Sequence, residues 1–161
     1  MDASATGAAS SDATADASNE ANDLLHATCV ALDAKSGLLI LGPSGSGKSA
    51  LALALMACGA HLVADDRTRI HRAAGADVVE ARCPEAIAGR IEARGVGILA
   101  ADPLASCVLR GVVDLSQIEE ERLPPLRETR LLGVSIPLFH KVDAPHFAPA
   151  LLQWLKGTRC A

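Results

Sequence analysis

The chain has 161 residues, half of them apolar, which is enough for one domain with a buried core and too few for two. Its 15 basic and 19 acidic residues give a net charge of −4 without any run of Lys or Arg, which argues against nucleic acid as a partner. The apolar runs are too short to cross a bilayer, so we expect no membrane contact.

The N-terminal segment differs in composition from the rest of the chain. Its first 20 residues are mainly Ala, Ser, Asp and Thr, with no basic residue and no apolar run typical of a signal peptide. Such a segment cannot bury enough apolar surface to offset the entropy lost on ordering. We therefore expect a disordered tail over residues 1–22 and one folded domain over residues 23–161.

The first folded segment predicts a hairpin followed by a helix. Residues 24–32 are apolar, residues 33–37 have turn chemistry, and residues 38–41 form a continuous apolar run typical of a strand covered on both faces. Residues 49–58 are rich in Ala and Leu and end at Gly59, which suits a helix C-terminus. Because this segment is apolar nearly all round, we expect a fully buried helix.

The remainder of the chain predicts mainly strands, with two further helices. The expected elements are a strand at 61–64, a hairpin of 68–72 with 78–82, a short helix opened by Pro84, strands at 106–115 and 131–139, and a closing helix at 146–156. Two glycines within 91–99 argue against a plain strand or helix there. Pro137 suggests a strand edge or end, and Trp154 should face the core.

The cysteines predict no metal site. They lack a C-x-x-C pair and have no histidine at ligand spacing, so we expect buried or free thiols of a cytosolic protein. The five are Cys29, Cys58, Cys83, Cys107 and Cys160.

One motif carries the chemistry. An eight-residue segment between the apolar strand and the helix matches the pattern G-x-x-x-x-G-K-[ST] in full. Glycines let backbone N–H groups turn toward phosphates, the lysine reaches the terminal phosphates, and the final hydroxyl ligates Mg²⁺. The pattern predicts binding of a Mg²⁺-bound nucleoside triphosphate by Gly42, Pro43, Ser44, Gly45, Ser46, Gly47, Lys48 and Ser49.

This motif alone leaves several classes of nucleotide-binding protein open. The chain has no N-K-x-D motif of GTPases and no L-S-G-G-Q signature of ABC proteins. Phosphoryl transfer therefore becomes the favoured reaction. A nucleotide-sensing regulatory module without transfer activity and a small-molecule kinase remain as alternatives.

Four segments in this order resemble the HPr kinase/phosphorylase family: His26, the glycine loop, HLVADD at 61–66 and IEARGVGIL at 91–99. The resemblance covers roughly residues 24–156 and is closest to short alphaproteobacterial-type members that have the C-terminal catalytic domain only. It implies an α/β P-loop fold related to phosphoenolpyruvate carboxykinase. It also implies an ATP- and Mg²⁺-dependent cytoplasmic enzyme that phosphorylates a serine of HPr, commonly as a hexamer.

The resemblance further implies roles for single residues. Asp66 matches the general base, Glu92 a second Mg²⁺ ligand beside Ser49, His26 an active-site histidine, and Arg122 the catalytic arginine. From the residues alone, Asp66 could be a salt-bridged surface acid and His26 a core residue.

Two other acids are candidates for the Walker B role. Asp65 is expected to orient water or the metal as a Walker B acid does. Asp102 is a lower-ranked rival for that role.

The C-terminal region departs from the family pattern. The family has a P-V-R-P-G-R loop associated with dephosphorylation, whereas this chain has Ile136-Pro137-Leu138-Phe139-His140-Lys141. A lysine does not reproduce the bidentate phosphate contact of an arginine. We therefore expect kinase activity with weak or absent phosphorolysis.

Overall fold

The computed structural model describes residues 21–157 and 159–161. The first half contains β1 Ala21–Leu25, β2 Thr28–Ala31, β3 Gly37–Leu41, α1 Lys48–Ala57, β4 His61–Ala64, β5 Thr68–Arg72 and β6 Glu80–Arg82. The second half contains the 3₁₀ turn η2 Glu85–Ile87, β7 Arg90–Ala93, β8 Gly97–Ala100, β9 Ser106–Ile118, β10 Arg127–Leu131, β11 Val134–Lys141 and α2 Phe147–Gly157.

The predicted tail lies outside the described residues, except at its end. Ala21 and Asn22 belong to β1, where they pair with Arg72 and His71 of β5. Strand β1 therefore includes the last two residues of the predicted tail.

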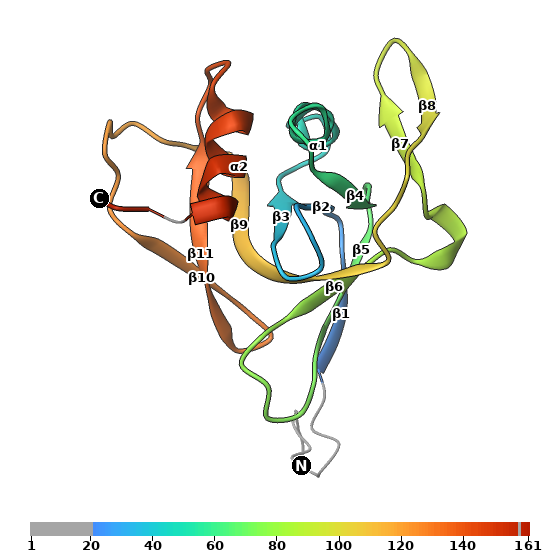
Figure 1. The fold of residues 1–161 in the computed structure, drawn as a ribbon, viewed down its shortest axis with the longest axis horizontal. Coiled ribbons are helices and arrows are strands. Elements are labelled where there is room, and N and C mark those ends of the chain that lie inside the picture. The colour runs from blue at the N-terminus through green and yellow to red at the C-terminus, as the bar shows by residue number, and fades with distance from the viewer. Residues whose placement is uncertain (1–20, 158) are drawn as a thin grey trace, which may run out of the picture.

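A nine-stranded sheet organises the fold, and β9 links its two parts. The strand order is β1-β5-β6-β9-β3-β2-β4, with β11 also pairing with β9 and β10 pairing with β11. The first residues of β9 pair with β6, and the following residues run parallel to β3 and β11. β9 curves strongly between these partners (Figure 1). The strand predicted over 106–115 thus extends to Ile118.

The core lies on both faces of β3, as the continuous apolar run predicts. Leu38 and Ile40 point toward α1 and α2, whereas Leu39 belongs to the cluster on the opposite face. Successive side chains of a strand alternate between its faces. Since all three are fully buried, the hairpin of β2 with β3 is held between two apolar layers.

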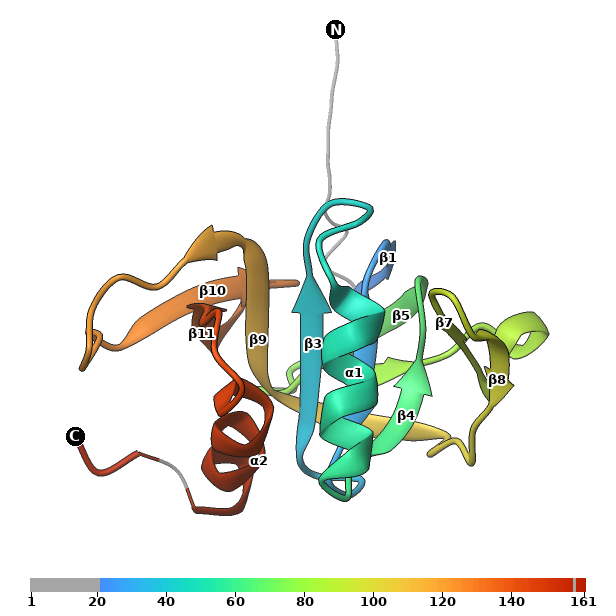
Figure 2. The same ribbon diagram turned by 90° about the horizontal axis from the view of Figure 1, so that it is seen from above.

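Helix α1 begins and ends close to the predicted bounds, but the expectation of burial all round is wrong. Lys48, Ala52 and Leu55 are buried, whereas Ala50 and Ala54 are exposed. The helix covers one face of the sheet, and α2 lies beside it (Figures 1 and 2). Alanine contributes little apolar area, so its presence on the outer face does not require burial.

The C-terminal strands differ from the single strand predicted over 131–139. Leu131 ends β10, and a turn at Leu132 and Gly133 leads into β11. Pro137 lies inside β11 and pairs in register with Glu128 of β10, just before the residues of β11 that pair with β9. The predicted short helix, both hairpins and the closing helix are present. None of the described helices is long and apolar enough to span a membrane.

All five cysteines are free, in agreement with the sequence. Cys29 and Cys107 are buried with their sulfurs 3.7 Å apart. The hydrogen bond with Cys107, followed by burial, holds the pKa of Cys29 well above its ordinary value. This thiol therefore stays protonated at neutral pH and behaves as a core side chain.

Gly37 has a steric function beside this pair of thiols. A Cβ at this position would overlap Cys107 Sγ and lie 2.9 Å from the carbonyl oxygen of Val108. We expect Gly37→Ala to lower the free energy of unfolding by about 1–3 kcal/mol, as overpacked cores do, measured by urea denaturation. Gly157→Ala is the control, since its Cβ would meet no described atom within 4 Å apart from its chain neighbours and the backbone of its own helix. Equal stability of the two variants would contradict this packing argument.

Candidate active site

The strand directions bring the candidate residues to one edge of the sheet. β3 and β4 are both antiparallel to β2, so the carboxyl ends of β3 and β4 lie beside the amino end of β2. The glycine loop follows β3, Asp65 and Asp66 follow β4, and His26 precedes β2. Three segments distant in sequence therefore meet where ligands of α/β sheets commonly bind.

A cleft of about 470 Å³ opens at this edge. Its walls are the glycine loop, the first turns of α1, the ends of β2 and β4, and the β7–β8 hairpin. This volume falls within the range of about 300–1,000 Å³ that small-molecule sites occupy. The hairpin is a separate two-stranded sheet that stands across from α1 (Figure 1).

The loop has the backbone that a phosphate site requires. Gly45 and Gly47 adopt φ angles of 84° and 101°, and open space surrounds the position of a Cβ at either residue. Glycine is therefore needed there for the backbone conformation, which leaves N–H groups and the N-terminus of α1 directed toward a ligand. In addition, Ser46 Oγ is buried without a hydrogen-bond partner among the described residues.

Lys48 is held inside this loop. Its side chain is only 7% exposed, and Nζ donates to the carbonyl oxygens of Gly42 at 2.8 Å and Pro43 at 3.2 Å. No described acidic side chain forms an ion pair with it. An ammonium group bound only to carbonyls keeps its positive charge available for a phosphate, which fits a polyphosphate ligand.

Asp65 is the centre of a hydrogen-bond network. Ser49 Oγ donates to its Oδ1 at 2.6 Å, Thr28 Oγ1 donates to the same oxygen at 3.1 Å, and the Glu92 N–H donates to Oδ2 at 3.1 Å. The carboxylate is 8% exposed. This contact between the P-loop hydroxyl and a strand-end acid is the arrangement expected of a Walker B acid.

The donor set fits Mg²⁺. No group of three or more His, Cys, Asp or Glu side chains among the described residues could hold a metal by itself. However, Mg²⁺ bound with a nucleotide needs only one or two protein oxygens, because phosphates and water complete its shell. Ser49 and Asp65 supply such oxygens in contact with each other, and Glu92 lines the same cleft.

Asp66 and His26 form a second pair at the mouth of the cleft. His26 Nε2 lies 2.7 Å from Asp66 Oδ1, and the two side chains are 52% and 65% exposed. His26 lies between β1 and β2, so the alternative of a core histidine in a strand is wrong. Asp66 has a φ of 70°, and its N–H donates to Thr28 Oγ1 at 3.3 Å. This backbone turns Asp66 away from Asp65, giving neighbouring acids different surroundings.

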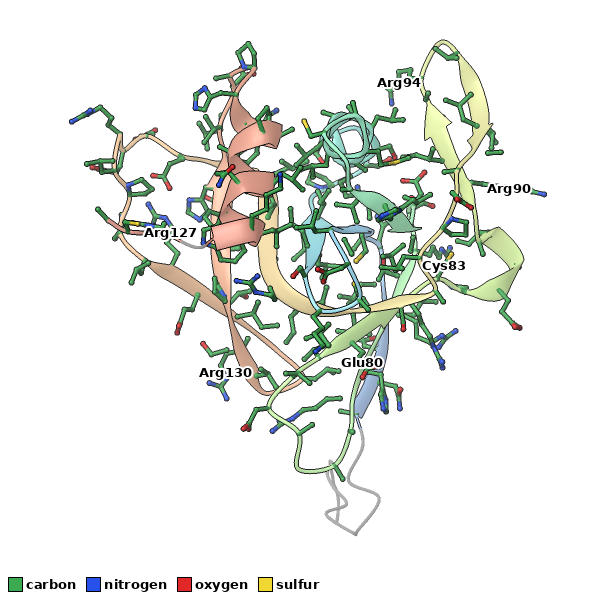
Figure 3. The ribbon with its side chains drawn as sticks, in the orientation of Figure 1. Glu80, Cys83, Arg90, Arg94, Arg127 and Arg130 are labelled. Atoms are coloured by element: carbon green, nitrogen blue, oxygen red, sulfur yellow. The ribbon has the colours of Figure 1, made fainter. Side chains whose placement is uncertain are left out.

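Arg94 and Thr28 are two cleft residues that the sequence prediction did not include. Arg94 follows β7, and Figure 3 shows its side chain on the side of the hairpin that faces α1. The spacing of two residues between Glu92 and Arg94 was a possible signal, since residues two apart in extended backbone lie on one face. Thr28 had no such signal, because its contact with Asp65 depends on the pairing of β2 with β4.

Arg122 and Asp102 are not brought to the cleft. Arg122 is exposed in the connection between β9 and β10, and Asp102 is exposed after β8. Neither residue lines the cleft. The β9–β10 connection lies on the opposite side of β3 from the β7–β8 hairpin (Figures 1 and 2). The structure therefore gives Arg122 no contact with Lys48 or Asp66 within one chain.

Comparisons with known proteins find relatives of one family. Residues 19–105 match the family model of the HPr serine kinase C-terminal domain. The chain is 42% identical over 114 residues to an HPr kinase/phosphorylase of Azoarcus sp., which covers 63% of this chain and 36% of that protein. It is 48% identical over 63 residues to the one of Chromobacterium violaceum, covering 39% of this chain and 20% of that protein.

The solved structures include a related fold. The structure of the HPr(Ser) kinase/phosphatase from Coxiella burnetii matches with a TM-score of 0.64 at 25% identity, covering 83% of this chain and 93% of that chain. The match to the Azoarcus protein spans only about a third of that relative's length. The mixed α/β fold and the matched residues nevertheless lead to one conclusion: the chain belongs to the HPr serine kinase C-terminal domain family.

Proposed function

We propose that this chain is an ATP-dependent kinase that transfers the γ-phosphoryl group of ATP to a serine of an HPr-like carrier protein. The proposal rests on one observation above all. Ser49, whose hydroxyl donates to the buried Asp65, lines the same cleft as the pair of His26 with Asp66 and the glycine loop. A phosphate site and a candidate base thus lie side by side.

Different residues are proposed for phosphate binding, Mg²⁺ binding and proton transfer. Lys48 and the loop N–H groups bind the phosphates, while Ser49, Asp65 and Glu92 are the candidate ligands of Mg²⁺. When bound, Mg²⁺ neutralises phosphate charge. Asp66 takes the proton of the substrate serine while the serine oxygen forms a bond to the γ-phosphorus. The bond from that phosphorus to the leaving ADP oxygen breaks.

His26 and Arg94 are proposed to support this step. His26 holds the Asp66 carboxylate in one orientation through their hydrogen bond. Arg94 faces the loop from the hairpin and can stabilise charge on the transferring phosphoryl group. Arg122 is proposed for that function by family resemblance, and it could act only after movement of its connection or from a neighbouring copy.

Intact mass spectrometry of HPr tests the proposal directly. We expect HPr incubated with this protein and Mg-ATP to gain a single phosphoryl group, and HPr with its target serine replaced by alanine to gain none. Unchanged HPr together with saturable nucleotide binding would favour the sensor alternative. Consumption of ATP with added metabolites but not with HPr would favour a small-molecule kinase.

The reverse reaction is expected to be weak. The segment that replaces the arginine-bearing loop of the family is the end of β11, where His140 and Lys141 are the basic residues. Neither presents the planar fork with which arginine binds phosphate. We expect little pyrophosphate when serine-phosphorylated HPr is incubated with the protein and inorganic phosphate. Pyrophosphate release at a rate near that of the kinase reaction would contradict this.

We also propose a cytoplasmic homo-oligomer, a hexamer by family resemblance. Size-exclusion chromatography with light scattering of the purified protein tests the assembly. A mass that stays at the monomer value across micromolar concentrations would remove that part of the proposal.

A further inference from the structure

A second pocket lies away from the cleft, between the C-terminal strands and α2. Its volume is about 320 Å³, and it shares no lining residue with the first cleft. β10 and α2 lie on the opposite side of β3 from the β7–β8 hairpin (Figure 2). The proposed kinase reaction therefore makes no use of this pocket.

Three arginines from three separate segments line this second pocket. They are Arg110 of β9, Arg127 of β10 and Arg159 after α2. Guanidinium groups repel one another, so their convergence on one pocket is unfavourable unless anions neutralise them. Whether the three charges are neutralised within the chain depends on the acidic side chains near them.

One of the three charges is neutralised internally. Arg127 donates to both carboxylate oxygens of Glu119, at 3.1 Å and 3.0 Å, and this contact lowers the pKa of Glu119. Arg110 instead donates to the backbone carbonyl of Leu155, and Arg159 donates to the backbone oxygens of Pro124 and Ala161. In the described part of the chain, neither of these two forms an ion pair with an acidic side chain.

The remaining wall of the pocket is apolar and partly aromatic. Trp154 and Phe139 meet edge to face with their ring centroids 4.8 Å apart. The Arg110 guanidinium lies 5.4 Å from the centroid of the Trp154 ring, at cation–π distance. Leu126, on the rim, is 82% exposed. The pocket thus combines two cations with an apolar, partly aromatic wall.

We infer that this pocket is a binding site for a small organic anion with an apolar body, whose carboxylate or phosphate group contacts Arg110 and Arg159 and whose body rests on Trp154. The volume is at the lower end of the range for small-molecule sites. Apolar walls with a few placed charges are what such sites use to fix orientation. This site is independent of the proposed transfer reaction.

Trp154 provides a direct readout, because the chain has a single tryptophan and no tyrosine. We expect 3-phenylpropionate and phenyl phosphate to change its fluorescence saturably, and whichever anion fits better identifies the head group. The uncharged analogue 3-phenylpropanol should bind at least tenfold more weakly. Propionate and inorganic phosphate, which lack the aryl body, should give no saturable change. Equal binding of 3-phenylpropanol, or no saturable change with either aryl anion up to 10 mM, would overturn the inference.

Substitutions of the two lining arginines test whether the anion binds in this pocket. We expect Arg110→Gln and Arg159→Gln each to weaken binding about tenfold, since each removes a charge-assisted contact. Arg90→Gln is the matched control, because Arg90 is exposed on β7 and extends away from the fold (Figure 3). Arg110 also supports α2 through Leu155, so Arg159→Gln decides the result if the Arg110 variant is unstable. Unchanged affinity in the folded Arg159 variant would overturn the assignment.

Discussion

Lys48→Ala is expected to weaken the binding of Mg-ATP at least ~100-fold and to abolish phosphoryl transfer. Lys48 is the buried cation of the glycine loop, and its Nζ is held by two loop carbonyls that cannot neutralise it. Charge-assisted hydrogen bonds contribute about 1.5–3 kcal/mol each, and every 1.4 kcal/mol changes an affinity tenfold. Isothermal titration calorimetry with Mg-ATP measures the loss.

The control for this variant is Lys35→Ala. Lys35 is exposed in the turn between β2 and β3, so its removal changes the net charge equally without touching the loop. Because Lys48 also bonds to Gly42 and Pro43, thermal unfolding of both variants must accompany the titration. Wild-type affinity in a folded Lys48→Ala protein would remove the loop from its proposed function.

The sequence was sufficient for the parts of the site that are continuous in the chain. The glycine loop, its flanking strand and its helix lie within 21 consecutive positions, 37–57, and each has a local signature in glycine spacing or apolar pattern. Asp65 and Asp66 were found for the same reason, as polar residues at the end of a short apolar strand. Their roles remain predictions that the variants test.

The contacts between segments were not predictable in this way. The Glu92 N–H reaches Asp65 only because the β7–β8 hairpin stands beside the end of β4. Nothing in the local sequence of the hairpin specifies that orientation. The location of Arg122 away from the cleft was not predictable for a related reason, since it depends on the direction in which β9 leaves the sheet.

Helix α1 shows the limit of apolar composition as a guide to burial. Its alternating Ala and Leu residues have no strong amphipathic pattern, so a buried helix and a helix lying on a sheet are equally compatible with it. The decisive factor is what the rest of the chain places over its outer face. Ala50 and Ala54 remain exposed because the described residues provide no second layer there.

Asp66→Asn is expected to retain Mg-ATP affinity within about threefold and to lower the rate of transfer to HPr by ~10²–10⁴, the usual contribution of a general base. Asp66 lies beside the phosphate loop at the mouth of the cleft, and it hydrogen-bonds to His26 rather than to the P-loop hydroxyl. Binding and chemistry should therefore separate in this variant. Calorimetry measures the first, and the rate of phosphoryl gain by HPr measures the second.

The choice of asparagine matters because Asp66 has a φ of 70°. Asparagine tolerates this left-handed backbone, whereas alanine would add strain and confuse a folding defect with a catalytic one. Asp65→Asn is the informative comparison, since Asp65 accepts from Ser49 and its loss should weaken Mg-nucleotide binding itself. Asp77→Asn, at an exposed position in the connection before β6, controls for the removal of one negative charge.

The two neighbouring acids are expected to differ: Asp66→Asn keeps Mg-ATP binding and loses transfer, whereas Asp65→Asn weakens binding itself. If Asp66→Asn retained turnover, Asp66 would lose its assignment as the base, and Asp65 would be a poor replacement because it is buried and accepts three hydrogen bonds. An incoming serine cannot readily reach such a carboxylate, because Asp65 is only 8% exposed and lies beneath Ser49, Thr28 and the Glu92 N–H. Asp66, 65% exposed and bonded to His26 through Oδ1, keeps a second oxygen for that proton.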